Sequence, residues 1–129
     1  TLSRMTGRDV GASRETLLMR GVLDMCVLAI LEGEPLHAYG LVQRLQECGF
    51  SAVSYGTVYP LVTRLKKQGL VDQTLEESPS GPARNVLQVN RSGRTALRLW
   101  SEQWHRTTEI TRRALSASQE TRGNENHVS

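Results

Sequence analysis

The sequence has few of the residues that build disulfide frameworks, aromatic cores or membrane spans. Aromatic residues make up 5% of its 129 positions and include a single Phe, so any core must be mainly aliphatic. Cys26 and Cys48 show no CxxC or Cys/His ligand spacing, which indicates reduced thiols in a cytosolic protein. No apolar run reaches the ~18 residues that span a bilayer, and no signal peptide is present. We therefore expect a cytoplasmic protein without membrane contact.

The sequence also lacks an arrangement of catalytic groups. Acid–base catalysis needs paired carboxylates or an oriented His, and nucleophilic catalysis needs a base beside a Ser or Cys. The acidic residues are scattered over predicted helix ends and a predicted hairpin. His37 is open to reading as a ligand or a base, but no second His lies near it, which favours a capping or solvated role. The sequence predicts no enzyme activity, no cofactor and no metal.

The charge of the chain is basic but small. The formal net charge is +3 with a pI near 9.2, and 14 of the 16 cationic residues are Arg. Arginine suits bidentate contacts with phosphate and guanine. A length of 129 residues allows one domain with a modest core. Because the total charge does not by itself indicate nucleic acid, the clustering of basic residues has to carry that argument.

Basic residues cluster in residues 54–71, SYGTVYPLVTRLKKQGLV. Four aliphatic residues at i, i+3, i+4, i+7 spacing predict one buried helix face: Val58, Leu61, Val62 and Leu65. Pro60 favours the first turn, which predicts a helix start near Gly56 or Thr57, and Gly69 ends the helix before a strand. The predicted outward face, suited to phosphates and base edges, carries Thr57, Tyr59, Thr63, Arg64, Lys66 and Lys67. The alternative is an ordinary amphipathic helix with a solvated charged face.

Two more helices are predicted before this stretch. Residues 15–32 are apolar nearly all round, and such a helix must be covered on more than one side, most simply by a partner chain. Residues 37–48 form the next helix, with Tyr39 among its expected core residues. A short link joins it to the basic helix, which is the arrangement of a helix-turn-helix.

A β-hairpin wing is predicted after the basic helix. Residues 70–75 and 86–89 are its strands, and residues 76–83, rich in Pro, Gly and Ser, form a long tip. Arg84 lies at the base of this tip, where we expect it to reach a phosphate or a narrow minor groove. Two glutamates in the tip oppose that role, because they would repel the DNA backbone.

A long helix is predicted to complete the fold. Asn90 is a good N-cap, and residues 91–117 carry an apolar face too wide for one neighbour. Residues 1–14 and 118–129 are polar, and we expect them to be disordered; the first is a basic arm for DNA or an idle tail. The predicted domains are therefore a winged helix-turn-helix over residues 15–90 and a dimerisation helix over 91–117.

Four motifs in this order resemble the PadR family of bacterial transcriptional regulators, from about residue 20 to residue 104. They are Pro35-Leu36-His37-Ala38-Tyr39-Gly40; Gly56-Thr57-Val58-Tyr59-Pro60-Leu61 with Arg64-Leu65 and Gly69-Leu70-Val71; Gly81-Pro82-Ala83-Arg84; and Asn90-Arg91-Ser92-Gly93. The chain departs from the family at Ala38, where a glycine is usual, and at Val86-Leu87, where an aromatic pair is usual. The second departure leaves room for a wing that packs differently.

The resemblance implies a mainly α fold with a small β-hairpin wing, namely a winged helix-turn-helix plus a long C-terminal dimerisation helix. It implies a repressor that binds a pseudo-palindromic double-stranded DNA operator as a homodimer. In that dimer the last helix packs on the partner's first helix, through Leu17, Leu18, Val22, Leu97, Trp100, Trp104, Thr108, Thr111 and Leu115. It also implies that Trp104, with Trp100 one turn away, stacks on a planar aromatic effector, although two such residues also suit a dimer seam. The alternative function is an interaction or ligand-sensing module that has lost DNA binding.

Overall fold

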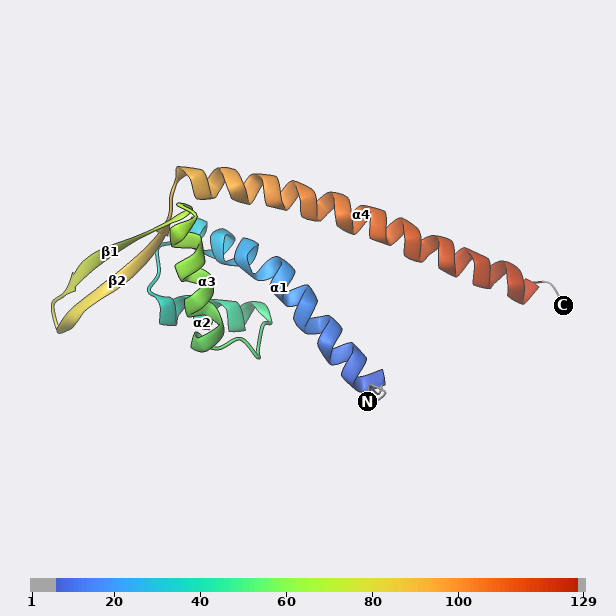
Figure 1. Cartoon of the computed structure of the whole chain (residues 1–129), viewed down its shortest axis with the longest axis horizontal. Helices are drawn as coiled ribbons and strands as arrows, with labels where there is room; N and C mark the ends of the chain where they lie inside the picture. Colours follow the sequence, from blue (N-terminus) through green and yellow to red (C-terminus); the bar gives the residue numbers. More distant parts are fainter. Residues whose placement is uncertain (1–6, 128–129) are drawn as a thin grey trace, which may run out of the picture. The chain divides into compact units, whose positions relative to one another are not determined.

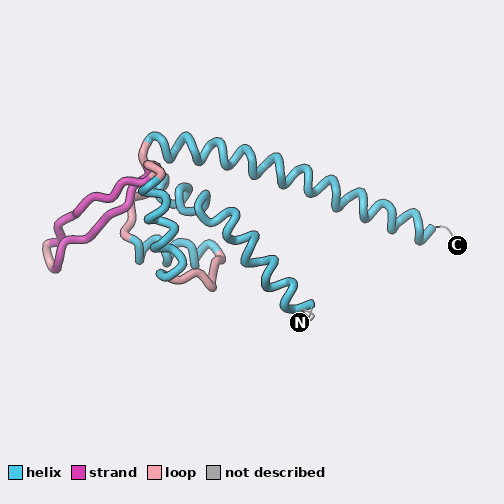
Figure 2. Tube along the Cα trace, viewed as in Figure 1, coloured by secondary structure: helices cyan, strands magenta, loops and turns pink. Residues whose placement is uncertain are grey.

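A computed structural model describes residues 7–127 of the chain. Of the segments predicted to be disordered, residues 1–6 and 128–129 lie outside this range, and residues 7–14 and 118–127 lie in helices. Figure 1 shows a mainly helical chain with one β-hairpin, and Figure 2 separates helices from strands by colour. The elements are α1 (Gly7–Gly33), α2 (Ala38–Cys48), α3 (Tyr55–Lys67), β1 (Val71–Ser78), β2 (Gly81–Val89) and α4 (Arg91–His127). The chain divides into two compact units between Leu97 and Arg98.

The core of the first unit is aliphatic, as the scarcity of aromatic residues predicted. Every buried apolar side chain among the described residues is Leu or Val. On α3, the four positions predicted to form its buried face are all buried. On α2, Tyr39 was expected in the core but is 66% exposed, because the buried face of this helix is made by Gly40, Leu41, Val42 and Leu45. The Tyr39 side chain is therefore available at the surface.

Helix α1 begins at Gly7, earlier than the predicted start at about residue 15. Its buried residues, Leu23, Val27, Leu28 and Leu31, all lie in its second half. The first half extends beyond α2 and α3 (Figure 1) and leaves Leu17 and Leu18 exposed. Among the α1 residues whose burial is described, the buried ones therefore lie in the second half, although residues 15–32 are apolar on nearly all sides.

The hairpin differs from its prediction, because the long tip is absent. Strands β1 and β2 pair antiparallel almost to their ends, and only Pro79 and Ser80 connect them. Ser78 lies opposite Gly81 and Glu76 lies opposite Arg84, so two residues of β2 face one residue of β1. This bulge contains Pro82, where a residue without an N–H group removes no ladder hydrogen bond. Proline at this position therefore does not end the strand.

The loop before α2 is joined to the wing by backbone hydrogen bonds. Leu36 N donates to Leu87 O at 3.1 Å, and Leu87 N donates to Leu36 O at 2.7 Å. Leu87 is also buried. The departure from the family pattern at this position therefore places an aliphatic side chain in the core.

Asn90 caps α4, as predicted, and also ties the start of α4 to the end of α3. Its Oδ1 accepts from Gly93 N at 2.9 Å, and its Nδ2 donates to Gly69 O at 2.9 Å. Gly69 has φ +75°, the left-handed backbone predicted for the residue that ends α3. Gly93 is buried against Leu70 O, where a side chain would overlap the backbone. The C-terminal end of α3 and the first turn of α4 are therefore adjacent.

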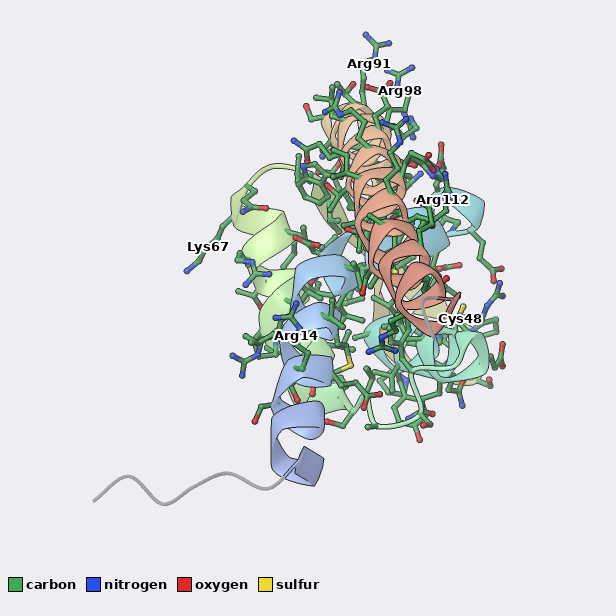
Figure 3. The ribbon with its side chains drawn as sticks, turned by 90° about the vertical axis from the view of Figure 1, so that its right-hand side faces the viewer. Arg14, Cys48, Lys67, Arg91, Arg98 and Arg112 are labelled. Atoms are coloured by element: carbon green, nitrogen blue, oxygen red, sulfur yellow. The ribbon has the colours of Figure 1, made fainter. Side chains whose placement is uncertain are left out.

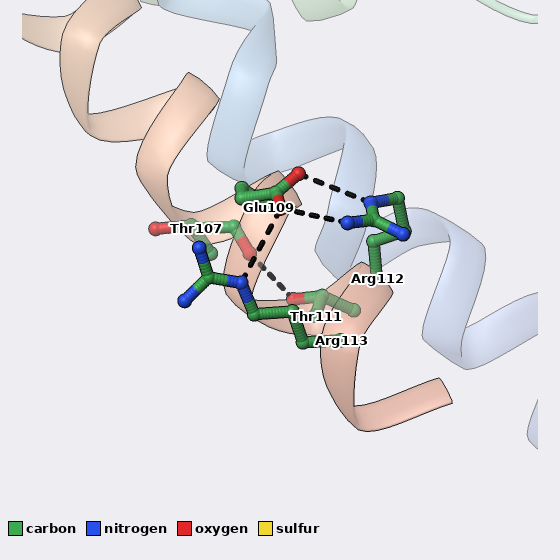
Figure 4. Close-up of polar contacts among 5 residues, drawn as sticks. All are labelled: Thr107, Glu109, Thr111, Arg112 and Arg113. Carbon is green, nitrogen blue, oxygen red and sulfur yellow. Dashed lines mark hydrogen bonds and ion pairs between the residues drawn. The ribbon is translucent and has the colours of Figure 1, made fainter. Parts of the chain in front are cut away.

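Helix α4 is 37 residues long and runs to His127, past its predicted end at about residue 117. Ion pairs within one turn line its polar side, where Glu109 accepts from Arg112 Nη2 at 2.8 Å and from Arg113 Nε at 3.3 Å (Figure 4). The hydrogen bond from Arg112 lowers the pKa of the Glu109 carboxyl group, and the hydrogen bond from Arg113 lowers it further by a smaller amount. Within the described part of the chain, no helix is both long and apolar enough to traverse a membrane.

Candidate nucleic-acid interface

The candidate interface is built on α3, which begins earlier than the sequence predicted. Its N-cap is Ser54, whose carbonyl accepts from Thr57 N and Val58 N, both at 3.1 Å. Pro60 is consequently the sixth residue of the helix, so the Gly56 carbonyl receives no helical N–H. The prediction that Pro60 lies in the first turn is therefore wrong. The earlier start places Tyr55 in the helix.

The outward face of α3 carries the six predicted side chains, but two of them, Thr63 and Lys66, are already hydrogen-bonded within the protein. Thr63 is half-buried, and its hydroxyl donates to Tyr59 O at 3.0 Å. Lys66 is also half-buried and donates to Gln73 Oε1 on β1 at 2.7 Å. Arg64 and Lys67 are exposed and form no ion pair with any described residue.

More cations lie at the end of α3, because the start of α4 adjoins it. Arg91 and Arg94 are exposed in the first turn of α4, and Asn90 holds that turn against Gly69. Figure 3 shows the Lys67 side chain directed into solvent from α3 and Arg91 projecting from the start of α4. The sequence prediction did not name Arg91 and Arg94, and Arg94 Nη1 also donates to Val89 O at 3.4 Å. The sequence feature that could have identified them is the pair of arginines that closely follows the N-cap Asn90.

Tyr55 was also missed, and it forms an aromatic pair with Tyr59 in the first turns of α3. The two ring centroids are 5.5 Å apart with an interplanar angle of 24°. The side chains remain 48% and 51% exposed. Among the described residues, no hydrogen bond of either hydroxyl group is seen. The sequence signal was the i, i+4 spacing of the two tyrosines, hidden by the late predicted start of the helix.

The wing places Arg84 toward α2. Arg84 lies opposite Glu76 in the hairpin, and its Nη1 is 3.3 Å from His37 Nε2. A guanidinium group only donates, so in this contact His37 Nε2 is the acceptor. His37 is the N-cap of α2, as the capping interpretation requires by position, but its side chain makes no capping bond, and its buried Nδ1 has no partner. These residues line a shallow pocket of about 270 Å³ against the wing.

The residues predicted for a dimer interface are largely exposed in the single chain. Leu17, Leu18, Trp104, Thr108, Thr111 and Leu115 are exposed, whereas Val22, Leu97 and Trp100 are half-buried. The hydroxyls of Thr108 and Thr111 each donate at 2.7 Å to the carbonyl four residues earlier, so they need no further acceptor. Exposed apolar side chains indicate an interaction surface where they gather into a contiguous patch. The subunit contact itself remains a prediction.

Metal ligation has no candidate centre in the described part of the chain, where no three His, Cys, Asp or Glu side chains come together. Cys26 is half-buried and Cys48 is exposed, and both are free thiols. Burial raises the pKa of the Cys26 thiol, with smaller contributions from the nearby Cys48 and Asp24. This keeps Cys26 protonated to higher pH than an ordinary thiol.

Comparison with known proteins agrees with this geometry. The model of the Transcriptional regulator PadR-like family matches residues 27–99. Similar crystal structures include a PadR family transcriptional regulator from Eggerthella lenta, with 32% identity and a TM-score of 0.76, covering 84% of this chain and 94% of that one. A PadR-like transcriptional regulator from Bacillus cereus has 31% identity and a TM-score of 0.71, covering 77% and 96%. No curated protein matches the chain.

Proposed function

The chain belongs to the PadR-like family of transcriptional regulators, and we propose that it is a repressor that binds a pseudo-palindromic operator as a homodimer. As a member of this family it is a winged-helix DNA-binding regulator and not an enzyme. One observation carries the proposal: Arg64 and Lys67 on α3 are exposed and unpaired among the described residues. Two copies of α3 enter successive major grooves about one helical turn apart. The regulator acts in the bacterial cytoplasm, where its DNA lies.

In this proposal different side chains of α3 make different contacts with DNA. Arg64 and Lys67 supply base-edge and phosphate contacts, because they are the cations free to leave the protein surface. Lys66 contributes charge while it stays bonded to Gln73. Thr57 and the Tyr59 hydroxyl lie near the helix N-terminus, where a phosphate oxygen is the favoured partner. Thr63 also faces the DNA, with its oxygen left as an acceptor.

Arg84 provides the wing contact in this proposal. In the free chain its guanidinium group is near His37 at 3.3 Å, which is a long and exposed hydrogen bond. Such a bond contributes little to stability, so a phosphate or a narrow minor groove competes for Arg84 easily. Glu76, its cross-strand neighbour, disfavours close approach of the DNA backbone, because its carboxylate repels phosphate.

The dimer forms, in this proposal, when the last helix packs on the partner's first helix. The winged domain of residues 15–90 then binds DNA and the helix of residues 91–117 joins the subunits. The support is the set of exposed apolar side chains on the first half of α1 and along α4, including Leu17 and Leu115. Burying them removes from water apolar area that a single chain leaves uncovered.

A planar aromatic effector is the proposed ligand of the dimer. Trp104 is exposed, and Trp100 is half-buried one turn before it on the same face of α4. Two symmetry-related indoles can sandwich a flat cation through stacking and cation–π attraction. The competing role for both residues is to fill the subunit seam, as large interface aromatics usually do.

The test of the function is the loss of operator binding when the α3 face is removed. Genomic fragments selected with the wild-type protein provide the operator. In the variant Thr63→Ala, Arg64→Ala, Lys67→Ala, operator affinity should fall ~10-fold or more per lost base contact, since each is worth about 1–3 kcal/mol. The matched control is Arg112→Ala, Arg113→Ala, which also removes two positive charges but from α4. Its affinity should change far less.

Two outcomes contradict the proposal. A folded triple variant with wild-type affinity would show that α3 does not read DNA. A wild-type protein that binds no fragment, or whose binding does not weaken as salt rises, would favour an interaction module instead. Both measurements use the full chain and need no knowledge of the effector.

A further inference from the structure

The stacked tyrosines at the start of α3 have no structural role in the core. The described core contains only Leu and Val, whereas Tyr39, Tyr55 and Tyr59 are all exposed. Tyr55 and Tyr59 lie one turn apart on α3 with their rings 5.5 Å apart, and half of each side chain remains open to solvent. An aromatic pair that is exposed and already ordered is suited to binding, because little conformational freedom is lost when a partner contacts it.

The position of the pair selects the partner. Recognition helices contact base edges with their N-terminal residues, and Tyr55 is the first residue of α3, directly after the N-cap Ser54. The major groove presents one apolar group at base edges, the 5-methyl group of thymine. An aromatic ring can cover that methyl group. The methyl group of Thr57 is another apolar group on this helix, but it is much smaller than the Tyr55 ring, and Tyr55 is the more N-terminal of the two.

We propose that the Tyr55–Tyr59 stack reads thymine in the operator through its 5-methyl group. The Tyr55 ring contacts the methyl group, and the Tyr59 ring supports it from behind, while the Tyr59 hydroxyl remains free for a phosphate. This inference rests on the proposed function and adds to it a residue that determines sequence preference. Burial of one methyl group corresponds to a roughly fourfold change in affinity, and two half-sites give about 15-fold.

The test replaces thymine by deoxyuracil, one position at a time, in the selected operator. Deoxyuracil keeps every hydrogen-bonding group of thymine and lacks only the methyl group. For the wild-type protein, at least one thymine per half-site should show the roughly fourfold loss. In Tyr55→Ala the difference between thymine and deoxyuracil at that position should vanish, and in Tyr55→Phe it should persist.

Control variants separate the possible failures. Tyr39→Ala removes a more exposed tyrosine from α2 and should keep the thymine preference. Because the preference is a ratio measured within one protein, a small loss of stability in Tyr55→Ala does not obscure it. A preference that survives in Tyr55→Ala, or no deoxyuracil effect at any position, would overturn the inference. Equal losses in Tyr55→Phe and Tyr55→Ala would show that the hydroxyl, not the ring, makes the contact. Absence of all DNA binding would instead contradict the proposed function.

Discussion

Replacing Gly93 by Ala should destabilise the winged unit even though alanine is the better helix former. Gly93 is the third residue of α4 and is buried. A Cβ atom added there would overlap the carbonyl oxygen of Leu70 and lie 2.6 Å from Val89 Cγ2. Both neighbours belong to the strands of the wing or the turn before them. The start of α4 must therefore move away from the end of α3.

The magnitude follows from three terms. The higher helix propensity of alanine contributes about 1 kcal/mol in favour of the variant. Overpacking against a rigid backbone costs about 1–3 kcal/mol. The 3.2 Å hydrogen bond from Asn90 N to Leu70 O is broken as α4 moves, at a cost of about 1 kcal/mol. The net loss is about 1–3 kcal/mol, which lowers the Tm of a domain of this size by roughly 4–24 °C.

Thermal melts followed by circular dichroism, at one protein concentration, measure this change. The matched control is Gly123→Ala in the same helix, where an added Cβ meets nothing within 4 Å. The control should melt at or slightly above the wild-type temperature. If Gly93→Ala melts as high as the wild type, the close approach of α4 to Leu70 is wrong, and the reasoning that joins the two helices fails with it.

Three further changes test the surface of the molecule. Leu97→Asp should place an unpaired charge in the proposed dimer seam at a cost of several kcal/mol, so sedimentation should report monomer or aggregate, and an equally stable dimer would contradict the proposed interface. Planar cationic dyes should quench tryptophan emission, and the quenching should vanish in Trp104→Ala; if no such dye quenches, the residue is interface core. Iodoacetamide should alkylate the exposed Cys48 before Cys26, whose raised pKa moves its reaction to higher pH. Equal rates at neutral pH would show that Cys26 is not shielded.

The buried pattern of the fold was predictable because it depends on local periodicity. The spacing of Val58 and its three partners predicted which face of α3 is buried, and Gly69 and Asn90 marked the ends of helices correctly. Each of these signals is read within a few residues of the chain. The family resemblance, carried by four short motifs, was confirmed by the family model that matches residues 27–99.

The errors arose where tertiary contacts outweigh a local rule. Pro60 predicted a late start for α3, but burial of the helix face outweighs one missing hydrogen bond, and the late start removed Tyr55 from consideration. The density of Pro, Gly and Ser in residues 76–83 predicted a long tip, but the strands stay paired through this region and a bulge accommodates Pro82. Side-chain bonds such as that from Lys66 to Gln73 join residues whose distance depends on the folded wing, and no spacing in the sequence predicts them.

The two backbone hydrogen bonds between Leu36 and Leu87 couple the position of the wing to that of the helix-turn-helix. Any force that tilts β2 must break both bonds or carry the loop before α2 with it. Breaking both costs about 1–3 kcal/mol, so the two segments stay joined in most molecules. Motion of the wing is thereby converted into motion of α2, whose packing against α3 sets the angle of the recognition helix. When the wing binds the minor groove, α3 would then be positioned in the neighbouring major groove at the same time.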